Sequence, residues 1–235
     1  MKKLFGITAT IVAALFLVAT ALCIQVLNVP QAASSFADGG LKIVIDAGHG
    51  GIDGGATGKK SGAKESDVNL AIARFLKDEL EDRGFEITLT RKTDAGLYDT
   101  TAKGFKKQDM QKRKEIIQET DPDLLVSIHQ NAFSSAAYRG GQVFYSKESA
   151  QGKAFANAVQ EKLNLFYTEE GAKVRIEKQG DFFILKCTEK PSVLVECGFL
   201  SNAKDEELLI SAVGQKKIAR AIAAGVTAYL ADALS

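Results

Sequence analysis

The sequence predicts an α/β fold: a single domain with a mostly parallel, twisted sheet of about six strands flanked by helices, preceded by an N-terminal hydrophobic helix. Short apolar runs typical of buried strands alternate along the chain with longer amphipathic segments typical of helices. At 235 residues, the chain is long enough to bury one substantial core and short for two. In such a sheet, the ligand crevice lies outside the carboxyl ends of the strands.

An apolar segment opens the chain. After two lysines, residues 4–29 carry no charge. A helix of this length, at ~1.5 Å per residue, reaches about 39 Å and spans a bilayer. We expect residues 1–29 to be a signal peptide or membrane anchor that places the following chain outside the cytoplasm. Residues 30–40 then form a linker, and residues 41–235 form the exported domain.

The first half of that domain has a regular pattern. The run LKIVID at 41–46 predicts a central strand. Residues 66–84 begin with a capping-type serine and end on glycine, with apolar residues at helical spacing between them. A second strand, FEITLT, is expected at 85–90, followed by a polar loop over 91–104. The segment 108–120 predicts a second helix, which the sequence DPD ends.

The second half continues the alternation. Apolar runs predict strands over 124–129, 140–146, 182–186 and 192–197. Helical patterns cover 148–166 and 214–234. Internal repeats are absent from the sequence.

Composition excludes some classes of partner and site. The net charge is +1, and removing the two lysines ahead of the apolar segment leaves 28 basic against 29 acidic residues. This balance gives no sign of a nucleic-acid partner. Cys187 and Cys197 are the cysteines of the exported part, and the chain has no C-x-x-C pair. A zinc site built from thiolates is therefore not expected, and the redox state of the two cysteines stays open.

The loop VIDAGHGGIDGG at 44–55 holds five glycines and His49, one of only two histidines in the chain; the other is His129. The loop does not match either of two nucleotide-binding patterns. A G-x-G-x-x-G pattern beginning at Gly48 requires glycine where Asp53 stands, and a P-loop pattern fails at the same residue. The loop is therefore not expected to bind phosphate.

Three polar residues share one topological position at strand ends. His49 follows the first strand, His129 ends the third, and Glu196 lies near the end of the last. If these strands are parallel, the three side chains point into one crevice. A carboxylate beside a buried strand is costly unless it is paired, so Glu196 is a candidate functional residue.

Two histidines suit a catalytic zinc site, which commonly has three nitrogen or oxygen ligands and keeps a fourth position open. A carboxylate is then needed as the third ligand. Glu65, Asp53 and Asp67 compete for this role on residue type alone. Glu65 has a structural alternative, because an acidic residue at the start of a helix complements the helix dipole.

At these residues the chain resembles the zinc-dependent N-acetylmuramoyl-L-alanine amidases of bacterial cell-wall turnover. The matching segments occur in the family's order and span nearly all of the exported domain. They are IVIDAGHGGIDGGATG (43–58), ESDVNLAIARFLKDELEDRGFEITLTR (65–91), DPDLLVSIHQNA (121–132), RGGQVFY (139–145) and PSVLVECGFLSNAKDEELL (191–209).

The resemblance implies one Zn²⁺ bound by His49, Glu65 and His129, with Glu196 as the catalytic carboxylate. The implied reaction is hydrolysis of the amide between N-acetylmuramic acid and the L-alanine of the peptidoglycan stem peptide. Asn131, two residues beyond a ligand, is a candidate for contact with the substrate; its structural alternative is to hold the loop after the strand.

The short chain with one N-terminal apolar segment is similar to the spore-cortex amidases of this family, which act with a deacetylase to make muramic-δ-lactam. This likeness implies a role in cortex maturation, in sporulation and germination, with peptidoglycan as substrate. Dependence on an activating protein partner stays open. Two alternatives stay open: a zinc peptidase acting on the stem peptides, and a non-catalytic or partner-dependent peptidoglycan-binding protein on the same fold.

Overall fold

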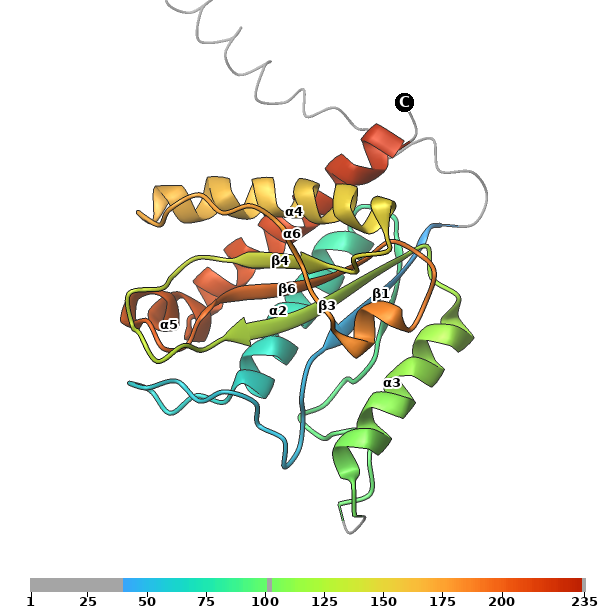
Figure 1. Cartoon of the computed structure of the whole chain (residues 1–235), viewed down its shortest axis with the longest axis horizontal. Coiled ribbons are helices and arrows are strands. Elements are labelled where there is room, and N and C mark those ends of the chain that lie inside the picture. The colour runs from blue at the N-terminus through green and yellow to red at the C-terminus, as the bar shows by residue number, and fades with distance from the viewer. Residues whose placement is uncertain (1–39, 101–102, 234–235) are drawn as a thin grey trace, which may run out of the picture. The chain divides into compact units, whose positions relative to one another are not determined.

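The computed structural model in Figure 1 describes residues 40–100 and 103–233. The expected signal peptide or anchor at 1–29 lies outside the described residues, as does nearly all of the expected linker. Within the described part of the chain, no helix has both the length and the apolar character needed to cross a membrane. Export and anchoring therefore stay predictions.

A six-stranded sheet forms the centre of the fold, in the order β2-β1-β3-β6-β4-β5. Its strands are β1 (Lys42–Ala47), β2 (Glu86–Leu89), β3 (Leu124–Asn131), β4 (Gln142–Tyr145), β5 (Lys178–Gln179) and β6 (Ser192–Phe199). The strands β2, β1, β3 and β6 run parallel, whereas β4 is antiparallel to β6. The sheet is therefore mixed, because β3 and β4 are joined by residues 132–141 without the crossover helix that a parallel return requires.

Helices cover both faces of the sheet (Figure 1). They are α2 (Glu65–Glu81), α3 (Phe105–Thr120), α4 (Ala150–Glu169), α5 (Ala203–Ile210) and α6 (Ala212–Ala233), with a short 3-10 helix η1 (Phe183–Lys186). The helices α2 and α4 each pack against α6 and against strands, and α3 contacts η1 and β1. The core between α3, η1 and the sheet contains Val44, Ile117, Leu125, Ile184 and Leu194, all buried.

Three details differ from the sequence predictions. The expected strand at 182–186 is wrong: these residues form η1, and the edge strand is the shorter pair Lys178–Gln179. A short apolar run does not distinguish a strand from a buried helical turn, and here Ile184 and Leu185 are buried by a 3-10 turn. The helix α5 was not predicted.

The third difference is at the start of α2, where Ser66 was expected to cap the helix. The helix begins one residue earlier, at Glu65, after Lys64. The first N–H groups of the helix are bound by backbone carbonyls of the returning glycine loop, since Glu65 N donates to Ala56 O (2.8 Å) and Ser66 N to Gly54 O (3.1 Å). No side-chain cap is needed, and the glycine loop is fixed to the helix that follows it.

The second-last residue of β1 is a buried carboxylate. Asp46 is 2% exposed and accepts hydrogen bonds from Arg113 Nη1 (2.6 Å), Ser127 Oγ (2.7 Å) and Thr90 Oγ1 (2.8 Å). Burial alone would raise its pKa, but the charge of Arg113 and these hydrogen bonds lower the pKa of Asp46 to about 2. The ion pair between Asp46 and Arg113 joins β1 to α3.

We predict that Asp46 stabilises the fold above pH 4 and loses this effect as the pH falls through about 2. A carboxyl group with a depressed folded-state pKa binds its proton more readily in the unfolded chain, so acid favours unfolding. The contribution is about 2 kcal/mol, from roughly 1.4 kcal/mol per pKa unit. Urea unfolding between pH 5 and pH 2 should show that the difference between wild type and Asp46→Asn shrinks in acid. The exposed-site control Asp94→Asn should follow wild type throughout, and a pH-independent difference for Asp46→Asn would contradict the account.

Candidate metal centre

Parallel strands bring the three predicted side chains to the same edge of the sheet. The strand β1 ends two residues before His49, and β3 and β6 carry His129 and Glu196 as direct neighbours in the register. The convergence expected from parallel strands is therefore present. It places a histidine pair and one carboxylate at the carboxyl ends of the central strands.

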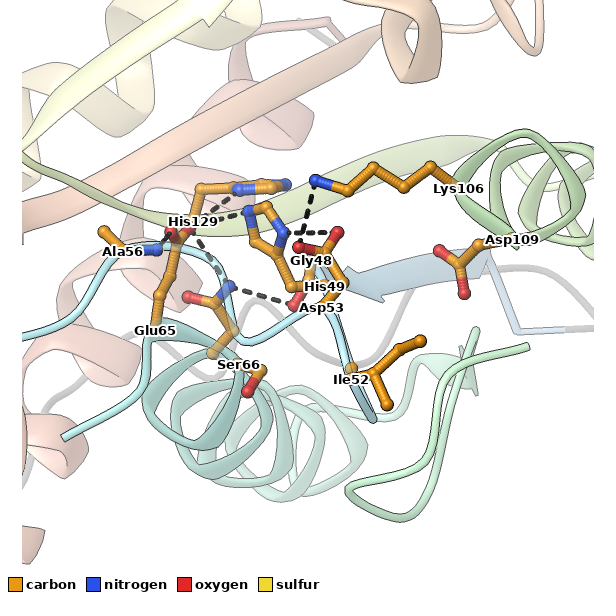
Figure 2. Close-up of polar contacts among 12 residues, drawn as sticks. Gly48, His49, Ile52, Asp53, Ala56, Glu65, Ser66, Lys106, Asp109 and His129 are labelled. Atoms are coloured by element: carbon orange, nitrogen blue, oxygen red, sulfur yellow. Dashed lines mark hydrogen bonds and ion pairs between the residues drawn. The ribbon is translucent and has the colours of Figure 1, made fainter. Parts of the chain in front are cut away.

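His49, Glu65 and His129 lie around one point, as Figure 2 shows. Their candidate ligand atoms all lie within 4.8 Å of one another. Glu65 Oε1 is 3.3 Å from His49 Nε2 and 3.0 Å from His129 Nδ1. The two imidazole rings meet edge to face, with their centroids 5.0 Å apart. Two imidazoles and one carboxylate make a donor set that suits zinc.

Glu65 is held in place at the start of α2. Its Oε2 accepts a hydrogen bond from Ala56 N (2.7 Å), and its Oε1 accepts one from Gln130 N (3.1 Å). Burial would raise the pKa of Glu65, but hydrogen bonds and charge from His129 and His49 hold that pKa well below its usual range. The carboxylate is therefore ionised and already oriented toward both histidines.

Asp53 orients His49 from the opposite side of the ring. Its Oδ2 lies 3.0 Å from His49 Nδ1, which directs Nε2 toward Glu65. Burial would lower the pKa of His49, but Glu65 and Asp53 together raise it. In many metal sites, a carboxylate that binds the second ring nitrogen of a histidine ligand fixes the orientation of that ligand. Of the acidic residues that the sequence left open, Glu65 joins the histidine pair, Asp53 supports it, and Asp67 is exposed and outside the cluster.

Two glycines make the close approach of these side chains possible. A Cβ atom at Gly48 would lie 2.2 Å from His129 Nε2, and one at Gly55 would lie 2.5 Å from Glu65 Oε2. Gly55 also has a φ of +65°, which disfavours other residues. The glycine-rich composition of this loop therefore serves the packing of the histidine and glutamate side chains against one another.

Buried arginines hold the backbone of the same loop. Arg113 donates to the carbonyls of Ala47 (2.7 Å) and His49 (2.6 Å), and Arg91 donates to those of Ala47 (2.8 Å) and Gly48 (3.1 Å). Three successive carbonyls are thus bound by two guanidinium groups. His49 has a φ of +61°, in the left-handed region that costs a non-glycine residue energy, and Arg113 stabilises this conformation.

Arg91 also links the loop to α2. Its Nη2 donates to Ser66 O (2.7 Å) as well as to Gly48 O. The same guanidinium group therefore fixes the loop carrying His49 and the helix turn carrying Glu65. Ligands that are pre-positioned in this way lose little conformational entropy when a metal binds.

Glu196 lies beside the cluster without belonging to it. Its Oε2 is buried and, among the described residues, has no hydrogen-bond partner. Burial raises the pKa of Glu196 to about 7, with His129 opposing and Glu65 adding to the shift. A carboxyl group that lines a cavity and has a pKa near neutrality is suited to proton transfer.

Asn131 ends β3, two residues beyond His129. Its backbone carbonyl accepts a hydrogen bond from Leu200 N (2.9 Å), and the residue is not part of the cavity lining around the ligands. Its contact with substrate stays a prediction. Cys187 and Cys197 are both buried and free.

The sequence of residues 43–228 matches the model of the N-acetylmuramoyl-L-alanine amidase family (Amidase_3). The chain belongs to this family. Its members hydrolyse the amide that joins N-acetylmuramic acid to the peptide of peptidoglycan, and the chain is accordingly an amide hydrolase.

Individual relatives agree with this assignment. This amidase is 35% identical over 195 residues to the germination-specific N-acetylmuramoyl-L-alanine amidase of Bacillus subtilis, covering 81% of this chain and 80% of the relative. It is 31% identical to the amidase AmiA of Escherichia coli, covering 80% and 75%. Its structure is similar to the CwlD amidase of Clostridioides difficile, solved in complex with the GerS lipoprotein, with a TM-score of 0.77, 39% identity and coverage of 81% and 98%.

The sequence reasoning missed the supporting residues of the amidase site. Arg113, Arg91 and the partner role of Asp53 were not predicted, although two signals were present. A charged residue, Asp46, ends an otherwise apolar strand, and Asp109 stands four residues before Arg113 on one helix face. Both signals indicate a buried charge pair, but neither gives its location.

We predict that Arg113→Lys lowers the zinc affinity of the amidase at least tenfold. Lysine keeps the charge but does not reproduce the fork that binds Asp46 and two loop carbonyls together. Competition with a fluorescent chelator measures the affinity, and a thermal melt measures the stability of each variant. The matched control is Arg139→Lys, because Arg139 is also mostly buried but binds Asp205 and the Glu170 carbonyl. Equal zinc affinities in these two variants would contradict the positioning role, and Arg91→Lys offers a second test.

Proposed function

We propose that this chain is a zinc-dependent amidase that cleaves the bond between N-acetylmuramic acid and L-alanine in peptidoglycan, and that it acts in maturation of the spore cortex. The observation that carries the zinc dependence is the cluster of His49, Glu65 and His129, with ligand atoms within 4.8 Å. The observation that supports a catalytic role for Glu196 is its buried oxygen without a hydrogen-bond partner, beside the cluster.

The residues fit a zinc ion by their chemistry. Two imidazoles and an ionised carboxylate provide three ligands of the preferred type, and the adjoining cavity of about 430 Å³ leaves room for water and substrate. His49 would bind through Nε2, because Asp53 occupies its Nδ1. When bound, zinc supplies Lewis acidity that polarises the scissile carbonyl and activates a water molecule.

Glu196 carries the proton in the proposed mechanism. Its carboxylate accepts a proton from the attacking water and later donates it to the nitrogen of the departing L-alanine. A carboxyl pKa of about 7 suits both steps near neutral pH. Glu65 remains ionised throughout, because the two histidines stabilise its charge. The two glutamates thus have separate roles, set by their surroundings.

The cortex role rests on likeness to relatives. The Bacillus subtilis relative is described as germination-specific, and the CwlD amidase was solved with a lipoprotein partner. By analogy, we propose that this chain removes stem peptides in the path to muramic-δ-lactam, in cooperation with a deacetylase, and that a protein partner increases an amidase activity that the chain already has on its own. The apolar N-terminal segment supports an exported location, either anchored in the membrane or released to the cortex space.

Glu196→Gln should retain zinc and lose activity. Glutamine keeps the size of the side chain but has no basic oxygen for the proton, so we expect a rate loss of 10²-fold or more. The full chain, purified in mild detergent and loaded with zinc, is incubated with peptidoglycan. Mass spectrometry then follows release of stem peptides with a free N-terminal alanine, and elemental analysis gives the zinc content.

The matched control is Glu189→Gln, which changes an exposed glutamate outside the site and should behave as wild type. A chelator should stop release by both active forms. Near-normal turnover of Glu196→Gln would refute the proton-transfer role. Products cut within the stem peptide would identify a peptidase instead, and zinc-loaded wild-type chain that releases no peptide would contradict the amidase proposal.

A further inference from the structure

The cavity beside the histidine cluster extends well past the metal ligands. It runs from His49 and Glu196 to the first turns of α3 and to η1, and has a volume of about 430 Å³. Met110, Phe182 and Phe183 supply an apolar side to it. The metal ligands occupy one end, so the remaining space is available to a part of the substrate next to the scissile amide.

One lysine extends into this space. Lys106, on the first turn of α3, lines the cavity, and Figure 2 shows its ammonium group directed toward the imidazoles of His49 and His129. Its Nζ lies 3.3 Å from Asp53 Oδ1, and the side chain is 68% exposed. An ammonium group has three donors, and among the described residues Asp53 is its one ion-pair partner.

The other charged side chains that line the cavity are either already hydrogen-bonded or negatively charged. Arg113 is 1% exposed and donates to Asp46, Asp109 and two loop carbonyls. The remaining charged side chains of the lining are carboxylates: Asp46, Asp53, Glu65, Asp109 and Glu196. A negatively charged substrate group would be repelled from most of this surface, and Lys106 is the accessible cation that can receive it.

We propose that Lys106 forms a subsite for a carboxylate of the stem peptide, namely that of the residue following L-alanine. This inference rests on the proposed function. In peptidoglycan that residue is D-glutamate, whose α-carboxyl group is either free or amidated. Lys106 therefore distinguishes free-acid stems from amidated stems, and the apolar side formed by Met110, Phe182 and Phe183 receives the aliphatic part of the same peptide.

The distances allow this assignment. Lys106 Nζ reaches His49 through two contacts, 3.3 Å to Asp53 Oδ1 and 3.0 Å from Asp53 Oδ2 to His49 Nδ1. The ammonium group thus lies within about three extended residues, at ~3.5 Å each, of the histidine that marks the scissile bond. The carboxylate in question belongs to the second residue of the stem.

A purely structural role for Lys106 gives a different result. If the lysine only neutralised Asp53 and so oriented His49, its loss would affect every substrate equally. A carboxylate subsite instead affects KM and only for the free acid. The discriminating measurement therefore compares two substrates that differ by one amide group.

The experiment uses the full zinc-loaded chain and two soluble glycopeptides that end in D-glutamate with its γ-carboxyl group blocked as a methylamide. The two are N-acetylmuramoyl-L-alanyl-D-glutamate γ-methylamide with a free α-carboxyl group and the same compound with that group amidated. Lys106→Met should raise KM for the free acid about tenfold, the loss expected for one charge-assisted hydrogen bond, and leave KM for the amide unchanged. Lys106→Glu should reverse the preference. The control Lys107→Met changes an exposed lysine of the same helix turn that does not line this cavity. Added salt should weaken the free-acid preference of wild type, because Lys106 is exposed.

Wild-type chain that cleaves neither glycopeptide contradicts the proposed function itself. Wild-type chain that cleaves them with a preference unchanged in Lys106→Met contradicts the carboxylate subsite alone. A fall in kcat for both substrates in Lys106→Met, without a change in their ratio, assigns the lysine to Asp53 and overturns the proposal as well.

Discussion

The candidate site depends on the way two buried guanidinium groups hold the backbone that follows β1. Three successive carbonyl groups, from Ala47 to His49, accept hydrogen bonds from Arg91 and Arg113. Gly48 O also accepts a hydrogen bond from Asn69 Nδ2 (3.0 Å), whereas His49 O depends on Arg113, which stabilises the left-handed conformation of His49. The negative charges of Asp46 and Asp109 compensate for burying Arg113. The same hydrogen bonds therefore stabilise the fold and hold the backbone of the site in place.

The carboxylates around the cavity have different roles because their surroundings differ. Asp46 is tied to a guanidinium group and serves the scaffold, and Glu65 is held between two imidazoles. Glu196 has a buried oxygen without a partner and a pKa of about 7, so it is the one suited to exchange a proton. Carboxylates whose oxygens are fully paired serve the structure here, and the carboxylate with an unpaired oxygen is suited to proton transfer.

Sequence reasoning predicted the parallel centre of the sheet and the meeting of His49, His129 and Glu196, because alternating strand and helix patterns favour parallel strands, whose carboxyl ends lie at one edge. The order of the strands could not be predicted, because apolar runs do not show which strands are neighbours. On residue type alone it left Glu65, Asp53 and Asp67 in competition, since the choice depends on how the glycine loop returns to α2, and the family resemblance selected Glu65. It placed a strand at 182–186, where burial by η1 and by a strand give the same apolar pattern. Arg91 could not be predicted, because it donates to backbone carbonyls, which the sequence does not distinguish. Asp46 and Asp109 indicated a buried partner for Arg113 but not its location.

The most direct test of the preorganised metal site is X-ray absorption at the zinc edge on the full chain loaded with one equivalent of zinc. The account predicts one tightly bound ion with nitrogen and oxygen neighbours at about 2.0–2.1 Å, imidazole scattering from two histidines, and loss of that signal in His129→Ala. A sulfur neighbour at about 2.3 Å would place the ion on a cysteine. That result, or an unchanged spectrum in His129→Ala, would contradict the account.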